Sequence, residues 1–164
     1  MSKNLKQIFY LFLDVDGVLN NSKSTGWNPD FTNVVLDTEN LNNYFSLLSF
    51  LQKRYEVKVV LSSGWVLHPE DLEFLKEKGV IWNRVSVRKL TSTREQEIRM
   101  TLREELKLRD GYDIHILQNF LVLDDQLQKK EWGDKLVHCT FQEGGFTKEL
   151  LQQTKKIITA KFPK

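Results

Sequence analysis

Short, continuous apolar runs alternate along this chain with segments of helical periodicity, and this alternation constrains the fold more than any other feature. The runs 8–13, 57–61 and 120–123 are rich in aromatic and β-branched residues, which is typical of strands buried on both faces. Two weaker strand candidates are 80–82 and 136–138. Because strands separated by helices are joined by crossovers, we expect a three-layer α/β/α sandwich around a mostly parallel sheet.

The segments between the runs carry helix start and stop signals. The predicted helices begin after Thr38, at Pro69, after Thr93 and after Thr147. Thr93 and Gln96 form a capping-box pattern, and Gly79 and Gly111 suit the ends of the second and third helices. Proline is favoured in the first turn of a helix, which agrees with a start at residue 69.

The length and charge of the chain fit one domain with no dominant electrostatic character. A domain usually takes about 100 to 200 residues, so we expect the 164 residues to form a single domain over 1–164. The 24 Lys and Arg residues nearly balance the 22 Asp and Glu residues, with a formal charge of +2. This balance excludes a global basic footprint for nucleic acid and leaves a local basic face open.

Redox and membrane signals both favour the cytoplasm. Cys139 is the only cysteine, which excludes an internal disulfide framework and agrees with a reducing compartment. The run 8–13 is far shorter than the roughly 20 residues of a membrane helix, and acidic residues follow it where a signal peptide needs small ones. We therefore expect a cytoplasmic protein that does not enter a membrane.

Polar residues follow three of the predicted strands at the point where each strand ends. They are Asp14 and Asp16 after the first, Ser62, Ser63 and Gly64 after the second, and Asp124 and Asp125 after the third. The carboxyl ends of parallel strands meet at one edge of a sheet, which is where such sheets bind ligands. Four carboxylates near one point repel each other unless a hard cation neutralises them, and Mg²⁺ is the ion that this pattern favours.

Other metal sites fit the sequence poorly. An EF-hand over 14–25 is excluded because Leu19 stands where the loop needs Gly and Thr25 where it needs Glu. His138 and Cys139 lack the spacing of zinc ligands. Each acidic motif alone is common in ordinary turns, so it is their order along successive strands that indicates a site.

Three segments resemble motifs of the haloacid dehalogenase-like (HAD) superfamily. Phe-Leu-Asp-Val-Asp-Gly-Val-Leu at 12–19 resembles motif I, Val-Val-Leu-Ser at 59–62 resembles motif II, and Leu-Val-Leu-Asp-Asp at 121–125 resembles motif IV. Motif III normally supplies a Lys, or sometimes an Arg, near a helix start, and the best match is Arg94. The resemblance covers the chain from about residue 9 to residue 126 and implies a Rossmann-like sheet; the chain after Trp132 carries no family motif.

The resemblance implies an enzyme that hydrolyses phosphate monoesters. It makes Asp14 the nucleophile that forms an aspartyl-phosphate, and Asp16 the general acid and then the general base. Ser62 would donate to the transferring phosphoryl group, whose oxygens Arg94 would neutralise. The residues implied to hold Mg²⁺ are Asp14, Asp124, Asp125 and, through its backbone carbonyl, Asp16.

The intervals between the motifs hold no full cap domain, so the site is expected to be open to a large substrate or a nucleotide end. The chain resembles small capless HAD domains of nucleic-acid repair and processing systems, with Leu-Ser-Ser at 61–63 ahead of a Trp and an Arg-x-x-Glu-Ile helix at 94–98. Ser63, Gly64 and Trp65 are therefore candidate substrate-binding residues. Trp65 and Trp27 either stack on a base or pack within the protein.

A set of basic residues before and within the helix after Thr93 has two interpretations. They either contact nucleic-acid phosphates or form the solvated outer face of an amphipathic helix, because acidic residues are interleaved with them. The residues are Arg84, Arg88, Lys89, Arg94, Arg99, Arg103 and Arg109.

Two alternatives to a nucleic-acid phosphatase stay open. One is a phosphatase for small metabolites whose site is closed by oligomerisation. The other is a phosphoacceptor or binding module that resembles a response-regulator receiver. The order of the motifs argues against the receiver, because its adjacent acids follow the first strand, whereas Asp124 and Asp125 come late in this chain.

Overall fold

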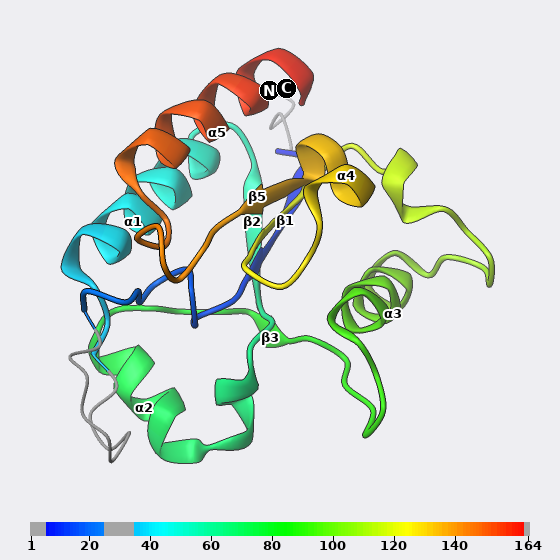
Figure 1. The fold of residues 1–164 in the computed structure, drawn as a ribbon. Helices are drawn as coiled ribbons and strands as arrows, with labels where there is room; N and C mark the ends of the chain where they lie inside the picture. The colour runs from blue at the N-terminus through cyan, green and yellow to red at the C-terminus, as the bar shows by residue number, and fades with distance from the viewer. Residues whose placement is uncertain (1–5, 25–34, 163–164) are drawn as a thin grey trace, which may run out of the picture.

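The computed structural model describes residues 6–24 and 35–162 and shows a five-stranded sheet between two layers of helices (Figure 1). All strand pairs are parallel, and the strand order is β3-β2-β1-β4-β5. The strands are β1 (Ile8–Leu13), β2 (Glu56–Leu61), β3 (Arg84–Val85), β4 (Phe120–Asp124) and β5 (Leu136–His138). The predicted three-layer α/β fold is confirmed.

The helices divide between the two faces of the sheet. They are α1 (Thr38–Gln52), α2 (Pro69–Glu77), α3 (Arg94–Leu106), α4 (Lys129–Trp132) and α5 (Lys148–Lys161), with 3₁₀ turns η1 (Gly64–Leu67), η2 (Ile114–Ile116) and η3 (Gly133–Lys135). Helices α1 and α5 cover one face, and α3 lies on the other (Figure 1). No helix among the described residues is long and apolar enough to cross a membrane.

Alternate side chains of β1 enter two separate cores. Phe9, Leu11 and Leu13 pack in the core under α1 and α5, whereas Tyr10 and Phe12 pack in the core under α3. Burying a side chain of this size stabilises a fold by about 1.5 to 3 kcal/mol. A strand that is apolar at every position therefore belongs in the middle of the sheet, and β1 is hydrogen-bonded on both edges, to β2 and β4.

The chain changes direction across the sheet at β1. The first three strands run outward from β1 in the order β1, β2, β3, and the chain then returns through α3 to β4 on the other side of β1. Ligands of such sheets bind outside the carboxyl ends of the strands where the order reverses. This rule places a site where β1 and β4 end.

The helix start signals are largely confirmed. The Thr93 hydroxyl accepts from the Gln96 amide and the Gln96 side chain accepts from the Thr93 amide, so the capping box of α3 is present. Thr147 caps α5, and Pro69 is the first residue of α2. Helix α1 is capped by Asp37, whose side chain accepts from the amide of Asn40.

Two local predictions are wrong. The run 80–82 is not a strand, because the Val80 amide closes the turn after α2 by donating to Leu75, and the edge strand β3 begins only at Arg84. Gly111 does not end α3: that helix ends at Leu106, and Lys107 adopts the left-handed conformation with φ of 51°. Gly111 lies in the loop that follows.

Candidate active site

The ends of β1, β2 and β4 lie level with one another. The backbone amide of Asp14 donates to the carbonyl of Leu123 at 3.0 Å, and the amide of Ser62 donates to the carbonyl of Leu13 at 2.8 Å. Asp124 is the last residue of β4. The structure therefore brings Asp14, Ser62 and Asp124 together from three strands, as expected from the positions of the motifs.

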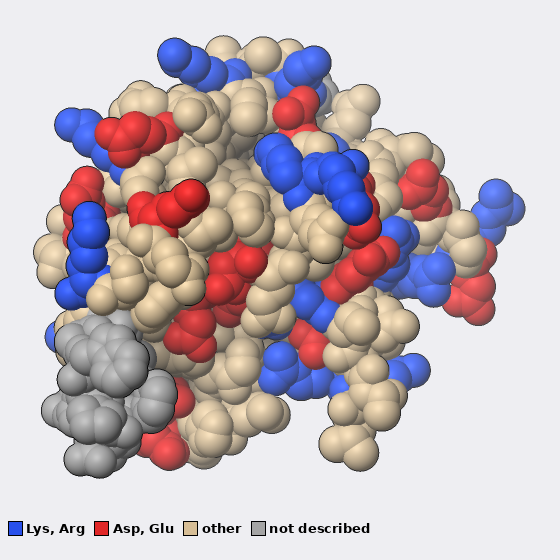
Figure 2. Space-filling view, viewed as in Figure 1, with Lys and Arg blue, Asp and Glu red and all other residues tan. Residues whose placement is uncertain are grey.

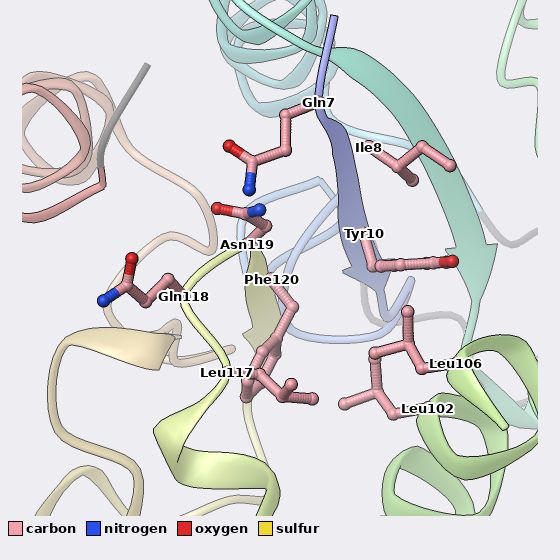
Figure 3. Close-up of a pocket in the computed structure, with 9 residues that line it drawn as sticks. All are labelled: Gln7, Ile8, Tyr10, Leu102, Leu106, Leu117, Gln118, Asn119 and Phe120. Carbon is pink, nitrogen blue, oxygen red and sulfur yellow. The ribbon is translucent and has the colours of Figure 1, made fainter. Parts of the chain in front are cut away.

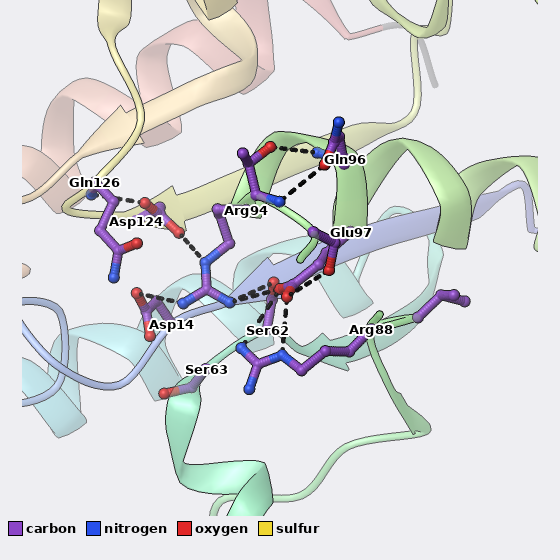
Figure 4. A network of polar contacts seen from close by, with 12 residues as sticks. Asp14, Ser62, Ser63, Arg88, Arg94, Gln96, Glu97, Asp124 and Gln126 are labelled. Carbon is purple, nitrogen blue, oxygen red and sulfur yellow. Dashed lines mark hydrogen bonds and ion pairs between the residues drawn. The ribbon is translucent and has the colours of Figure 1, made fainter. Parts of the chain in front are cut away.

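The Arg94 side chain joins these strand ends from the first position of α3 (Figure 4). Its Nη2 lies 3.2 Å from Oδ2 of Asp14, its Nη1 lies 3.3 Å from Oγ of Ser62, and its Nε lies 3.1 Å from Oδ2 of Asp124. The contact with Asp124 is a close ion pair without hydrogen-bond alignment. With 7% of its side chain exposed, Arg94 is a buried residue of the site, and the solvated surface position that many helix-start arginines occupy is excluded.

Glu97 is a further member of this group, and it is the Glu of the Arg-x-x-Glu-Ile pattern at 94–98, to which the sequence alone assigned no role. It is 4% exposed and lies one helical turn after Arg94, whose Nη1 donates to its Oε2 at 3.2 Å. Its Oε1 accepts from Nε of Arg88 at 2.8 Å and from the Ser92 hydroxyl at 3.2 Å. The three-residue spacing from Arg94 was the available signal, since residues three apart share one face of a helix.

Three carboxylates form a compact cluster beside Arg94. Asp14, Asp124 and Asp125 each offer an oxygen, and these oxygens lie within 4.8 Å of one another. Oδ1 of Asp125 is buried without a hydrogen-bond donor, and Oδ2 of Asp124 has the ion pair with Nε of Arg94 but no aligned hydrogen bond. Buried anionic oxygens without donors are costly unless a cation neutralises them. The cluster therefore fits a hard divalent ion such as Mg²⁺, which prefers carboxylate oxygen ligands.

The backbone around the cluster holds two of these carboxylates in place. Oδ1 of Asp124 accepts from the amides of Gln126 and Leu127 at 2.7 and 3.0 Å. Gly17 has φ of +68°, and a Cβ at that position would collide with the Asp125 carboxylate. The Gly of motif I is therefore needed both for its backbone conformation and for the space that Asp125 occupies.

The electrostatics of the cluster favour an added positive charge. Burial raises the pKa of the Asp14 carboxyl to about 7, and the charge of Asp124 acts in the same direction, while Arg94 opposes both. Burial also raises the pKa of Asp124 and of Asp125. Arg94 alone does not compensate three neighbouring carboxylates, so a divalent ion would complete the charge balance.

The Asp16 side chain lies apart from this cluster. Its carboxylate is exposed, with Oδ2 accepting from Nε1 of Trp65 at 3.0 Å and Oδ1 accepting from Nδ2 of Asn20 at 2.8 Å. Asn20 also accepts from the amide of Gly17 through its Oδ1 at 2.9 Å. The Asp16 side chain is thus held at the rim and is not part of the cluster of Asp14, Asp124 and Asp125. The resemblance implied a metal role for this residue through its backbone carbonyl and not through this side chain.

The three substrate-binding candidates after β2 are placed differently from one another. Ser63 is fully buried and caps η1, and its hydrogen bond to Asp14 partly opposes the rise in the pKa of that carboxyl which burial causes. Gly64 is exposed, with open space around its Cα. Trp65 is 5% exposed and packs against Phe74. Stacking of Trp65 on a base does not agree with this burial, and Trp27 lies outside the described residues.

Most of the basic residues before and along α3 are paired with acids. Arg84 pairs with Glu104 and Glu105, Arg99 with Glu95, and Arg103 with Asp110, while Arg88 pairs with Glu97. Asp and Glu side chains gather near the middle of the view in Figure 2, with Lys and Arg beside them over α4 and toward α3. The pairing supports the interpretation of α3 as an amphipathic helix with a charged outer face.

A pocket of about 280 Å³ lies at the opposite edge of the sheet (Figure 3). Its walls are the start of β1, the start of β4 and the second half of α3, including Tyr10, Phe120, Leu102 and Leu106. None of the carboxylates of the cluster lines it. It is therefore separate from the site at the carboxyl edge.

Comparison with known families agrees with this site. The site combines carboxylates at the ends of β1 and β4 with a hydroxyl after β2 and an arginine at the start of α3. The model of the family described as the HAD domain in Swiss Army Knife RNA repair proteins matches residues 10–151. The chain belongs to this family. No curated protein and no solved structure gives a significant match.

Membership in the HAD superfamily, which the motifs implied, is thus confirmed. The matched range of this HAD domain includes all three strand ends and Arg94, and it extends past the last motif into the first turn of α5. Family membership supports a hydrolase-type enzyme. The geometry of the HAD domain shows, in addition, which side chains lie together at its site.

Proposed function

We propose that this HAD domain is a Mg²⁺-dependent phosphatase that hydrolyses a phosphate monoester at a nucleic-acid end through an aspartyl-phosphate. The observation that carries the proposal is the Arg94 guanidinium, which bridges Asp14 and Ser62 beside the three-carboxylate cluster. A buried cation next to a carboxylate nucleophile and a metal-binding cluster is the arrangement that phosphoryl transfer needs.

Arg94 and Ser62 would bind the transferring phosphoryl group. Nη1 of Arg94 lies 3.3 Å from the Ser62 hydroxyl, and Nη2 lies 3.2 Å from the Asp14 carboxylate. A phosphoryl group bound beside Asp14 would therefore accept hydrogen bonds from both Arg94 and Ser62. A planar guanidinium matches the equatorial oxygens of phosphate better than a single ammonium does. This geometry supports Arg94 in the place of the Lys that the family usually supplies.

Asp14 would attack phosphorus with a carboxylate oxygen. Its Oδ1 accepts from the Val15 amide at 2.7 Å, which fixes the plane of the carboxylate, and the new O–P bond would form as the bond to the leaving oxygen breaks. A Mg²⁺ ion held by Asp14, Asp124 and Asp125 would neutralise the cluster and the phosphate charge. Burial raises the pKa of Asp14, and this supports the need for a cation beside it.

Asp16 would move the protons. In the first step its carboxyl group gives a proton to the leaving oxygen, and in the second its carboxylate takes a proton from the water that attacks the phospho-Asp14. The hydrogen bonds from Trp65 and Asn20 hold this side chain at the rim, where a leaving group and water have access. The products are inorganic phosphate, the dephosphorylated alcohol and a regenerated Asp14.

The nucleic-acid end is supported by the family and by the openness of the site. The matching family is described from RNA repair proteins. Between Ser62 and Arg94 the chain forms only η1, α2 and β3, so no inserted domain covers the site from that interval. A terminal phosphate on a long strand needs such access, whereas a small metabolite does not.

The proposal is tested by phosphate release with Mg²⁺ and with EDTA. The substrates are RNA and DNA oligonucleotides with a 3′- or 5′-phosphate, nucleoside monophosphates and sugar phosphates. We expect release from one oligonucleotide end, loss of release in EDTA, and a decrease of at least about 10³-fold in Asp14→Asn. Asp134→Asn, a change in an exposed acid of η3, is the matched control and keeps full activity.

Four results would contradict the proposal. Activity retained in Asp14→Asn excludes the nucleophile, and activity retained in EDTA excludes the cation. Faster turnover of sugar phosphates or mononucleotides than of every oligonucleotide favours the metabolite phosphatase. A phospho-form that is stable for hours would indicate a phosphoacceptor module instead.

A further inference from the structure

A buried carboxylate outside the metal cluster, that of Glu97, holds Arg94 from the side of α3. We propose that Glu97 is a positioning residue: it keeps the Arg94 guanidinium in its phosphoryl-binding orientation when Asp14 and Asp124 turn to a divalent ion. This inference is built on the proposed function of Arg94. The Arg-x-x-Glu-Ile pattern at 94–98 contains Glu97, and the sequence alone assigns this side chain no role.

The contacts of Arg94 show why an additional anchor is needed. Arg94 lies beside three carboxylates, those of Asp14, Asp124 and Glu97. Asp14 and Asp124 belong to the cluster that fits a cation, and Glu97 does not. A carboxylate that ligates a cation attracts a guanidinium less strongly. Among the ion pairs of Arg94, the one with Glu97 at 3.2 Å is therefore the one that metal binding leaves intact.

The buried contact between Glu97 and Arg94 fixes the orientation of the guanidinium. The side chain of Glu97 is 5% exposed and that of Arg94 is 7% exposed. The contact joins Oε2 of Glu97 to Nη1 of Arg94, and the same Nη1 donates to Ser62. Because the guanidinium is planar, fixing Nη1 between Glu97 and Ser62 also fixes the direction of Nη2. Nη2 is the atom that faces Asp14.

Arg88 balances the charge of Glu97. Its Nε donates to Oε1 of Glu97 at 2.8 Å, and its Nη2 donates at 3.5 Å to Oε2, the oxygen that Arg94 also contacts. One carboxylate between two guanidinium groups leaves a net positive charge on the trio. Glu97 can thus orient Arg94 without cancelling the charge that a phosphate dianion requires.

A purely structural alternative is that Glu97 serves only to hold the loop 86–93. Arg88 and Ser92 on that loop both donate to its Oε1, and the Val87 amide ties the same loop to Thr101 at 2.7 Å. Arg88→Gln separates the two roles, because it removes a loop contact and leaves the Glu97–Arg94 pair in place. The loop alternative predicts equal effects for Arg88→Gln and Glu97→Gln.

The test combines kinetics with a direct signal from Arg94. The proteins are wild type, Glu97→Gln, Arg88→Gln and the matched control Glu95→Gln, which changes a glutamate of α3 paired with Arg99 rather than Arg94. The Nε–Hε resonance of Arg94, assigned by its absence in Arg94→Lys, is followed by ¹⁵N NMR with Mg²⁺ and without substrate. Values of kcat and KM are measured on the best phosphomonoester of the panel.

We expect Glu97→Gln to lower kcat about 10- to 100-fold with KM changed less than about threefold, and to shift or broaden the Arg94 resonance in Mg²⁺. Glu95→Gln leaves both unchanged, and Arg88→Gln retains a kcat well above that of Glu97→Gln. A wild-type kcat and an unmoved Arg94 resonance in Glu97→Gln would overturn the inference, as would equal losses in Glu97→Gln and Arg88→Gln.

The design separates the inference from the proposed function. If wild type releases no phosphate from any substrate, the proposed function fails, and the Arg94 resonance still decides whether Glu97 positions that side chain. If Glu97→Gln does not fold, Glu97→Asp replaces it, since it keeps the charge and shortens the reach. Glu97→Asp must then shift the Arg94 resonance and lower kcat, and a wild-type result for both overturns the inference.

Discussion

The indole Nε1 of Trp65 donates a hydrogen bond of 3.0 Å to Oδ2 of Asp16. Trp65 is buried in η1 after β2, whereas Asp16 is exposed after β1. The bond therefore connects a rigid, buried ring to the one carboxylate of motif I that faces solvent. This hydrogen bond fixes the orientation of the Asp16 carboxylate, the proposed proton donor, which as an exposed side chain would otherwise be free to rotate.

Replacing Trp65 by Phe tests this connection. The Phe ring keeps most of the packing against Phe74 and loses the donor to Asp16. A hydrogen bond to a charged group contributes about 1.5 to 3 kcal/mol, so we expect kcat to fall roughly 10- to 100-fold in a phosphatase assay. Trp82→Phe, a change in a half-buried ring before β3, is the control, and equal activities of the two variants would contradict the prediction.

Gly17→Ala should weaken metal binding. The added Cβ would collide with the Asp125 carboxylate, in a backbone with φ of +68°. We expect the Mg²⁺ concentration for half-maximal activity to rise about 10-fold or more, with a stability loss of about 1 to 2 kcal/mol in urea unfolding. Gly111→Ala has similar backbone strain at φ of +78° and open space around the Cβ. Gly111→Ala should lower stability without changing the Mg²⁺ requirement. If both variants need more Mg²⁺, displacement of Asp125 is excluded as the cause of the higher requirement.

Arg94→Lys introduces the residue that is usual in the family, and we expect it to lower the activity of this protein. A lysine ammonium has no planar fork and cannot contact Asp14, Ser62 and Glu97 together as Arg94 does. We expect kcat to fall about 10²- to 10³-fold, measured at saturating Mg²⁺. Arg99→Lys, at the position paired with Glu95, serves as the control. Full activity of Arg94→Lys would show that a single positive charge is sufficient.

Glu105 should make stability depend on acidic pH. The hydrogen bond from Arg84 at 2.8 Å is the main cause that lowers the pKa of Glu105 below its ordinary value of 4.5. A lowered pKa in the folded state stabilises the protein above the unfolded-state pKa, and this contribution is lost as pH falls through the folded-state pKa. Glu105→Gln should thus be less stable than wild type at pH 7, with a smaller difference near pH 4, in urea unfolding. A constant difference at both pH values would contradict the assignment.

The parts of the fold and the site that follow from local rules could be predicted from the sequence. An unbroken apolar run must lie inside the sheet, which placed β1, the second half of β2 at 59–61, and β4 as far as residue 123. Acidic residues directly after such strands must meet at one edge, which placed Asp14 and Asp124. The capping box fixed the start of α3, and with it Arg94.

The parts that depend on contacts between distant segments could not be predicted. Glu97 lies in the Arg-x-x-Glu-Ile pattern at 94–98, but its contacts gave no signal, because its partners Arg88 and Ser92 come from a loop without periodicity. Trp65 gave no sign of its bond to Asp16, which joins two different strand ends. The two-residue strand β3 is too short to carry a pattern of its own.

The central place of β1 in the sheet also bears on how the protein folds. Asp14 and Asp124 end neighbouring strands, yet α1, β2, α2, β3 and α3 all come between them in the chain. A nascent chain that has not yet produced β4 holds only one of the three clustered carboxylates. Affinity for a divalent ion would then arise only when β4 pairs with β1. Binding of the ion during synthesis would therefore indicate that these two central strands have paired.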